Sequence, residues 1–192
     1  MPGRRIVVWG VTGSGKTTLA KQLGEALRLP VVELDGIRHA RGWDSTGWDD
    51  FRVILTQRLE SYGGGWVVEG SYSAVHDVYL SRADTLLWLH LPFRVSFWRL
   101  LRRTVARAWD QKPLYNEDGP HESWRQSFFS RNSILWWAIR MHRDRKRVIP
   151  QRIAALPRQV RVQELRSSRE VAALLEAVVR RRAGETAGSQ AD

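Results

Sequence analysis

The stretch that decides the fold reads IVVWGVTGSGKTTLA and runs from Ile6 to Ala20. It opens with four apolar residues, which are typical of a buried strand, and it closes with the spaced leucines of a helix. Between them lie three glycines, which permit backbone angles that other residues resist: Gly10, Gly13 and Gly15. The stretch therefore predicts a tight turn that joins a buried strand directly to a helix.

The same turn has the composition of a phosphate-binding loop. Unpaired N–H groups at a helix start, together with the helix dipole, favour an anion there. The spacing matches the Walker A pattern G-x-x-x-x-G-K-[ST], in which Lys16 reaches the β- and γ-phosphates and the Thr17 hydroxyl ligates Mg²⁺. We therefore expect ATP to bind at the following residues: Gly10, Thr12, Gly13, Ser14, Gly15, Lys16, Thr17 and Thr18.

Composition limits what can surround this loop. With 192 residues, 43% of them hydrophobic, the chain can form one domain with a real core, which we place at residues 1–182. The polar tail, 183–192, is expected to be disordered. The sequence contains no apolar run of the ~18 residues that a membrane span needs, and it shows no secretory signal. With no cysteine, the chain forms no disulfides, which fits a cytoplasmic protein.

Positive charge is concentrated in one segment. The net charge is +11, and the segment from Arg94 to Arg152 holds 14 basic and five acidic residues. Such an excess favours an anionic partner. Nucleotide phosphates, a nucleic-acid backbone and an acidic membrane surface all satisfy this condition.

Apolar patterns along the rest of the chain alternate between strands and helices. Strands are expected at 6–9, 31–35, 66–70, 83–91 and 159–162. Helices are expected from Lys16, over 46–59 with a Thr46–Asp49 capping box, and at 93–109, 121–147 and 169–182. This alternation predicts a doubly wound α/β fold with a parallel sheet. Ligands bind at the carboxyl ends of such strands, where we place Gly10, Asp35, Glu69 and His90.

Several motifs together resemble a known superfamily. GVTGSGKTTLA, VVELD, WVVEGSY and FWRLLRRTVARAW are similar to the P-loop nucleotide kinases. A later tract, GPHESWRQSFFSRNSILWWAIRMHRDRKR, resembles the adenylate-kinase-like proteins called FlaR-type "DNA topology modulation" proteins. The resemblance covers about Arg5 to Leu165. It implies a five-stranded parallel sheet, an acceptor-binding region at 36–65 and a lid and basic helical region at 93–147.

The resemblance also implies roles for individual residues. Asp35 would orient or deprotonate the acceptor, with Arg38 and Trp43 beside it, although an aspartate there is also a common turn former. Glu69 would hold a water on Mg²⁺, or else cap a nearby loop. The stripe Arg99, Arg103 and Arg107 recurs at helical spacing and would clamp the transferring phosphoryl group, or else form a solvated basic face.

Two classes of function follow from these patterns. The first is a Mg²⁺-dependent kinase that transfers the γ-phosphoryl group of ATP to a small acceptor. That acceptor would be a nucleotide, a nucleoside or another hydroxylated metabolite. No Pro-Arg follows Glu69-Gly70-Ser71-Tyr72 as it does in true adenylate kinases, so the resemblance supports phosphoryl transfer better than it supports AMP as the acceptor. The second is a nucleic-acid-associated NTPase, favoured by the basic segment but lacking any recognised nucleic-acid motif. A nucleotide-binding regulator without catalysis is a third alternative.

Overall fold

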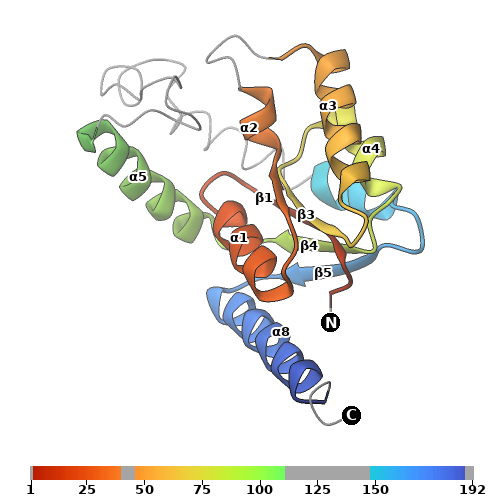
Figure 1. The fold of residues 1–192 in the computed structure, drawn as a ribbon. Helices are drawn as coiled ribbons and strands as arrows, with labels where there is room; N and C mark the ends of the chain where they lie inside the picture. The colour runs from red at the N-terminus through yellow and green to blue at the C-terminus, as the bar shows by residue number, and fades with distance from the viewer. Residues whose placement is uncertain (1, 40–45, 111–147, 189–192) are drawn as a thin grey trace.

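The computed structural model describes residues 2–39, 46–110 and 148–188, with the backbone alone at 107–110 and 185–188. Its centre is a five-stranded sheet in the order β2-β3-β1-β4-β5 (Figure 1). All four neighbouring pairs are parallel. The strands are β1 Arg5–Gly10, β2 Val31–Glu33, β3 Trp66–Glu69, β4 Thr85–Leu89 and β5 Arg161–Leu165. The predicted α/β fold with a five-stranded parallel sheet is confirmed.

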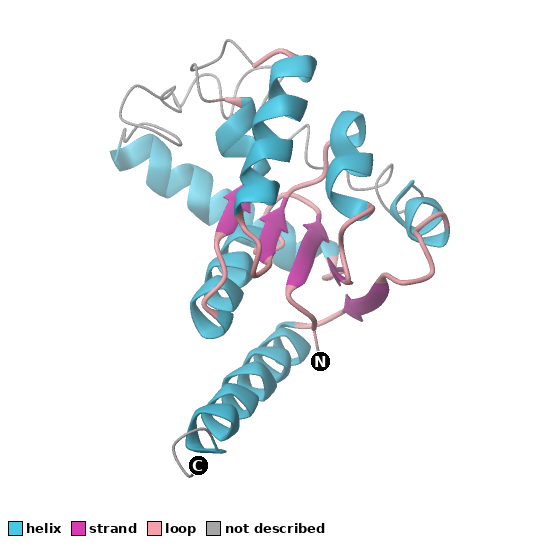
Figure 2. Cartoon of the chain, turned by 45° about the vertical axis from the view of Figure 1, so that its right-hand side comes forward, coloured by secondary structure: helices cyan, strands magenta, loops and turns pink. Residues whose placement is uncertain are grey.

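Helices lie on both sides of this sheet, as Figure 2 shows. Residues 148–154 are also helical. The other helices are α1 Lys16–Leu27, α2 Leu34–Arg38, α3 Trp48–Ser61, η1 Ser73–Val75, α4 His76–Leu80, α5 Phe93–Asp110 and α8 Ser168–Gly188. Because successive strand residues face opposite sides, β1 contributes to two cores. Val7 and Trp9 pack with α3 and α4, whereas Ile6 and Val8 pack with α1 and α8.

Parallel pairing brings the carboxyl ends of the strands to one edge. Strand β1 runs between β3 and β4, with Val8 opposite Glu69 and Gly10 opposite Leu89. The loop that follows Gly10 and the acid that ends β3 are therefore neighbours at that edge. Strand β2 lies on the far side of β3, so the residues that follow β2 reach the same edge from one side.

Three local predictions are wrong. Strand β2 ends at Glu33, and Asp35 lies in the first turn of α2, where a carboxylate is favoured by the helix dipole. The capping box does not form, because the Thr46 hydroxyl donates to the Ile37 carbonyl at 2.9 Å. Helix α8 continues to Gly188, so the expected disordered tail is helical in its first part, which contains good helix formers such as Ala183.

Other expectations fall on residues that the structure does not describe. These are the helical tract at 121–147, the part of the lid region at 111–120 and the acceptor residue Trp43. In the described part of the chain, none of the helices has the length and apolar character required to cross a membrane.

Candidate active site

The glycine-rich loop takes the conformation that its sequence predicts. Gly15 is the residue before α1 and has a φ of 94°, a left-handed angle that favours glycine. The Ser14 N–H donates to the Val11 carbonyl at 3.1 Å, which closes the turn. Lys16 folds back over the loop, and its Nζ donates to the same carbonyl at 3.2 Å. A cation and the first N–H groups of α1 therefore lie together at the start of the helix.

Helix α5 packs directly against this loop. Gly13 has a φ of 80°, and a Cβ built on it would overlap the Ser96 carbonyl oxygen and lie 3.0 Å from Leu100 Cβ. Arg99, on the same helix, donates from Nη1 to the Ser14 carbonyl at 3.3 Å and from Nη2 to Ser168 Oγ at 2.9 Å. Arg99 thus joins the loop to the start of α8, beside the position that phosphates would occupy.

Thr17 and Glu69 meet beside the loop. The Thr17 hydroxyl donates to Glu69 Oε1 at 3.1 Å. Glu69 is only 2% exposed, and its Oε2 is a buried oxygen for which the structure gives no hydrogen-bond partner. Burial raises the pKa of the Glu69 carboxyl, opposed by the charge of Lys16. A buried oxygen in need of a partner, next to a hydroxyl, fits a hydrated Mg²⁺ site.

Among the described residues, no three metal-ligating side chains of the His, Cys, Asp and Glu type cluster together. This agrees with the chemistry of Mg²⁺, which keeps several waters and binds one or two protein oxygens plus substrate phosphates. A dedicated cage of protein ligands is therefore not needed for the site that Thr17 and Glu69 offer.

A second group of side chains gathers around Asp35. The Tyr72 hydroxyl donates to Asp35 Oδ1 at 2.6 Å. The Tyr72 ring packs edge-on against Phe51, with the ring centroids 5.6 Å apart, and contacts Trp48 at 6.0 Å. The Arg38 guanidinium lies 4.1 Å above the Trp48 ring, a cation–π contact. Trp48 is 45% exposed, so this aromatic group extends from the core to the surface.

The remaining predicted site residues divide into three groups. Thr12, in the loop, is half-buried, and Thr18, in the first turn of α1, is exposed. Arg103 is exposed on α5, one turn beyond Arg99, whereas the side chain of Arg107 and all of Trp43 lie outside the described residues. His90 reaches the expected edge but pairs with Glu164, with Nδ1 2.5 Å from Oε1, and stacks on Trp88.

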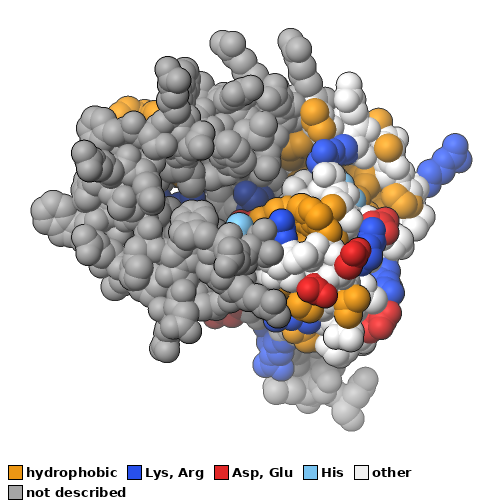
Figure 3. All heavy atoms as spheres, turned by 90° about the horizontal axis from the view of Figure 1, so that it is seen from above, with side chains coloured by type: hydrophobic (Ala, Val, Ile, Leu, Met, Phe, Trp, Pro, Cys, Tyr) orange, Lys and Arg blue, Asp and Glu red, His pale blue; other side chains and the backbone are white. Residues whose placement is uncertain are grey.

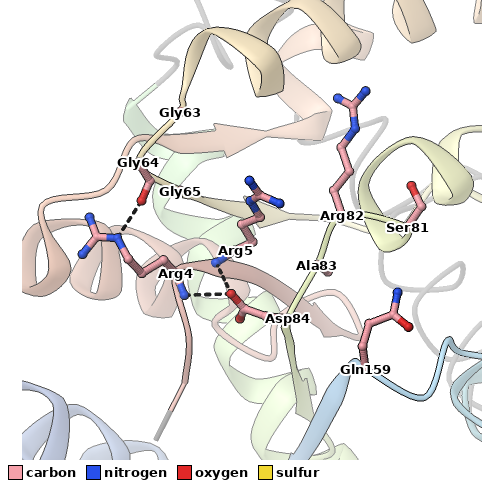
Figure 4. A pocket seen from close by; sticks show the side chains of 10 residues that line it. All are labelled: Arg4, Arg5, Gly63, Gly64, Gly65, Ser81, Arg82, Ala83, Asp84 and Gln159. Carbon is pink, nitrogen blue, oxygen red and sulfur yellow. Dashed lines mark hydrogen bonds between the residues drawn. The ribbon is translucent and has the colours of Figure 1, made fainter.

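A hollow of about 470 Å³ lies at the opposite, amino-terminal ends of the strands (Figure 4). Arg4, Arg5 and Arg82 line it, together with Asp84, whose carboxylate already accepts hydrogen bonds from the main chain. Asp84 Oδ2 accepts the main-chain N–H groups of Arg4 and Arg5 at 2.9 and 2.8 Å. Arg82 pairs with Glu60 at 2.9 Å. This hollow is separate from the glycine-rich loop. The hydrogen bonds of Asp84 connect the starts of β1 and β4 there.

Two residues of the site were not predicted from the sequence. Tyr72 follows the acid Glu69 by three positions, but nothing in the sequence indicated that its hydroxyl would reach Asp35. Trp48 lies under Arg38, and its sequence neighbours do not indicate this contact. Both depend on how α2, α3 and the turn after β3 come together, which no local pattern encodes.

Comparisons with known proteins agree with this geometry. A family model described as shikimate kinase matches residues 12–156, about three quarters of the chain. A solved gluconokinase from Sinorhizobium meliloti 1021 is 18% identical over 100% of this chain and 98% of its own, with a TM-score of 0.50. Shikimate kinase from Acinetobacter baumannii, solved with shikimate, is 12% identical over 95% and 94%, with a TM-score of 0.56. At these identities, the solved structures support the fold alone.

The comparisons support the P-loop kinase superfamily that the sequence resembles, but not the finer likeness to FlaR-type proteins. They also favour a kinase over the nucleic-acid-associated NTPase. The loop, its lysine and the family match lead to one conclusion. The chain belongs to the shikimate kinase family, and it is an ATP-dependent kinase that phosphorylates a small molecule.

Proposed function

We propose that the enzyme transfers the γ-phosphoryl group of ATP to a hydroxyl of a small hydroxylated carboxylic acid. The observation that carries this proposal is the pair Asp35 and Arg38 on α2. Residues three apart in a helix lie on the same side, so a carboxylate and a guanidinium lie within one turn. The Arg38 Nη1 is buried, and the structure gives it no hydrogen-bond partner.

A buried guanidinium nitrogen in need of a partner suits a carboxylate, which binds arginine through charged hydrogen bonds. Two similar proteins are described with ligands of this class: one is a gluconokinase, and the other was solved with shikimate. Gluconate and shikimate are both hydroxylated carboxylic acids. Trp48, with Arg38 over its ring, adds an exposed aromatic surface next to this pair.

In the proposed reaction, the loop amides and Lys16 hold the β- and γ-phosphates, and Asp35 receives the proton of the acceptor hydroxyl. The hydroxyl oxygen then bonds to the γ-phosphorus as the bond to the bridging oxygen breaks and ADP leaves. Bound between Thr17 and Glu69, Mg²⁺ would neutralise charge on the phosphate oxygens. Arg99, at the Ser14 carbonyl, is the arginine that we assign to the phosphate end of the site.

Other expectations remain proposals of the same kind. Arg103 and Arg107 are assigned to a lid, and the cytoplasm is the proposed compartment. A role with nucleic acid, implied by the FlaR-type resemblance and by the basic segment, is not part of this proposal. Seen from above, the described atoms of this face include apolar, basic and acidic side chains (Figure 3).

The test is an acceptor panel with MgATP, read as ADP release. Gluconate and sorbitol form a matched pair of open-chain polyols that differ only in the carboxylate, and shikimate, AMP and a nucleoside complete the panel. We expect phosphorylation of a carboxylic acid and little of sorbitol. Equal rates with gluconate and sorbitol, or activity with AMP alone, would contradict the assigned acceptor class.

Arg38→Ala should raise the KM for the carboxylic acid about ten- to a hundredfold, since a hydrogen bond to a charged group contributes about 1.5–3 kcal/mol. The affinity for ATP should stay unchanged. Arg58→Ala is the matched control, because Arg58 is exposed near the end of α3. An Arg38→Ala enzyme that keeps the wild-type KM would show that the carboxylate binds elsewhere.

A further inference from the structure

We propose that Tyr72 is a positioning residue that fixes the Asp35 carboxylate for the reaction. The proposal rests on the proposed function, since Asp35 must be the group that receives the acceptor proton. Its starting point is the 2.6 Å hydrogen bond from the Tyr72 hydroxyl to Asp35 Oδ1. A phenol that donates to a carboxylate forms a short, charge-assisted bond, stronger than a bond between neutral groups.

The turn that carries Tyr72 is held against α2 by a glycine. Gly70 has a φ of 117°, and a Cβ built on it would lie 3.0 Å from Leu34 Cβ. Leu34 is fully buried and directly precedes Asp35. Only glycine combines this backbone angle with so close an approach. The main chain at residue 70 therefore lies directly on the first residue of α2, which brings the Tyr72 hydroxyl within reach of Asp35.

The other end of the turn is also fixed. The Ser71 hydroxyl and His76 Nε2 lie 3.2 Å apart, so the turn is tied to α4. The Val75 N–H donates to the Tyr72 carbonyl at 3.1 Å, at the start of η1. The backbone of Tyr72 is thus held by contacts on both sides, and its side chain projects from a fixed point.

Aromatic packing then sets the direction of the side chain. The Tyr72 ring stands at 88° to the ring of Phe51, which is fully buried, and at 57° to the ring of Trp48. Both partners belong to α3. Edge-on contacts of this kind are favourable and resist rotation of the ring. The hydroxyl is therefore held in place toward α2.

This arrangement has a consequence for the chemistry at Asp35. A carboxylate rotates readily about its last bond, because that torsion is broad. With Oδ1 held by Tyr72, we assign Oδ2 to the acceptor hydroxyl. The acceptor proton moves to Oδ2 as its oxygen bonds to the γ-phosphorus and the bridging bond of ATP breaks. Tyr72 keeps its own proton throughout, so it acts through Asp35 and not on the substrate.

Tyr72→Phe removes the hydroxyl and keeps the ring packing. We expect kcat to fall about ten- to a hundredfold, since a small misplacement of a reacting group costs up to about a hundredfold. The KM for ATP should stay unchanged. In an Asp35→Asn background, the same change should have little further effect, because residues that act as a unit are not additive. Tyr62→Phe, at the end of α3 near the opposite edge of the sheet, is the matched control.

A second readout needs no acceptor. In protein labelled with ¹³C at the aspartate carboxyls, the Asp35 signal is identified by its loss in Asp35→Asn. It should move in Tyr72→Phe and stay in place in Tyr62→Phe. An active wild type whose kcat is unaffected by Tyr72→Phe would overturn the role of Tyr72 and leave the proposed function intact. If the wild type phosphorylates no acid in the panel, the proposed function fails, and the ¹³C signal decides alone: an unmoved signal overturns the proposal for Tyr72.

Discussion

Replacing Gly13 with alanine tests whether helix α5 and the phosphate loop form one packed unit. The residue has a φ of 80°, which costs roughly 1–2 kcal/mol for an L-residue. The added methyl would also overlap the Ser96 carbonyl and crowd Leu100 Cβ at 3.0 Å, both of which lie on α5. Relieving such overpacking costs roughly 1–3 kcal/mol. Together, these effects should destabilise the protein by about 2–5 kcal/mol.

Thermal unfolding measures this loss directly. For a chain of this length, about 2–4 °C is expected per kcal/mol, so the midpoint should fall by about 10 °C. The affinity for ATP, measured by calorimetry, should also fall, because the clash separates the loop from Arg99. Gly184→Ala is the control, since a Cβ at Gly184 meets nothing within 4 Å. If Gly13→Ala and Gly184→Ala have the same unfolding midpoint and the same affinity for ATP, α5 does not pack against the loop as we describe.

Three further predictions concern the loop, the metal and a half-buried histidine. Lys16→Ala should abolish measurable ATP binding in calorimetry without loss of the fold, and wild-type affinity would refute the assignment of the loop. Activity should vanish in EDTA and return with Mg²⁺, and Glu69→Gln should raise the Mg²⁺ concentration needed for half-maximal rate; full turnover without divalent metal would rule the site out. Burial, with a smaller contribution from the charge of Arg152, lowers the pKa of His76 to about 4, so folding favours the neutral ring. The contribution of the neutral His76 ring to the free energy of unfolding should be complete above pH 6.5. It should fall by about 2 kcal/mol as the pH drops toward 4, allowing for the partial exposure of the ring. Measured by urea unfolding, His76→Gln should lack this dependence on pH.

The sequence predicted those parts of the site that depend on local rules. The loop between β1 and α1 follows from glycine positions and helix-terminus electrostatics, which are written in consecutive residues. Glu69 could be placed beside the loop because parallel strands end at one edge, and β3 pairs with β1. The presence of the sheet itself followed from the alternation of strands and helices.

The acceptor side could not be predicted in the same way. Asp35 was expected at the end of a strand and lies in α2, because β2 pairs with β3 only as far as Glu33. A stretch of three residues gives too little periodicity to separate strand from helix. The contact between Tyr72 and Asp35 spans 37 positions and depends on the turn at Gly70. The sequence shows a glycine at position 70 but does not show that its φ is positive.

The two sides of the site are therefore built by different means on one edge of the sheet. The phosphate side is fixed by β1, α1 and α5, with Gly13 and Arg99 bringing α5 onto the loop. The acceptor side is fixed by α2, α3 and the turn after β3. Glu69 and Tyr72 belong to the same short segment, one facing Thr17 and the other facing Asp35. Because only two residues lie between them, this segment sets the spacing between the phosphate side and the acceptor side, and a lengthened turn should disturb transfer more than it disturbs the binding of ATP.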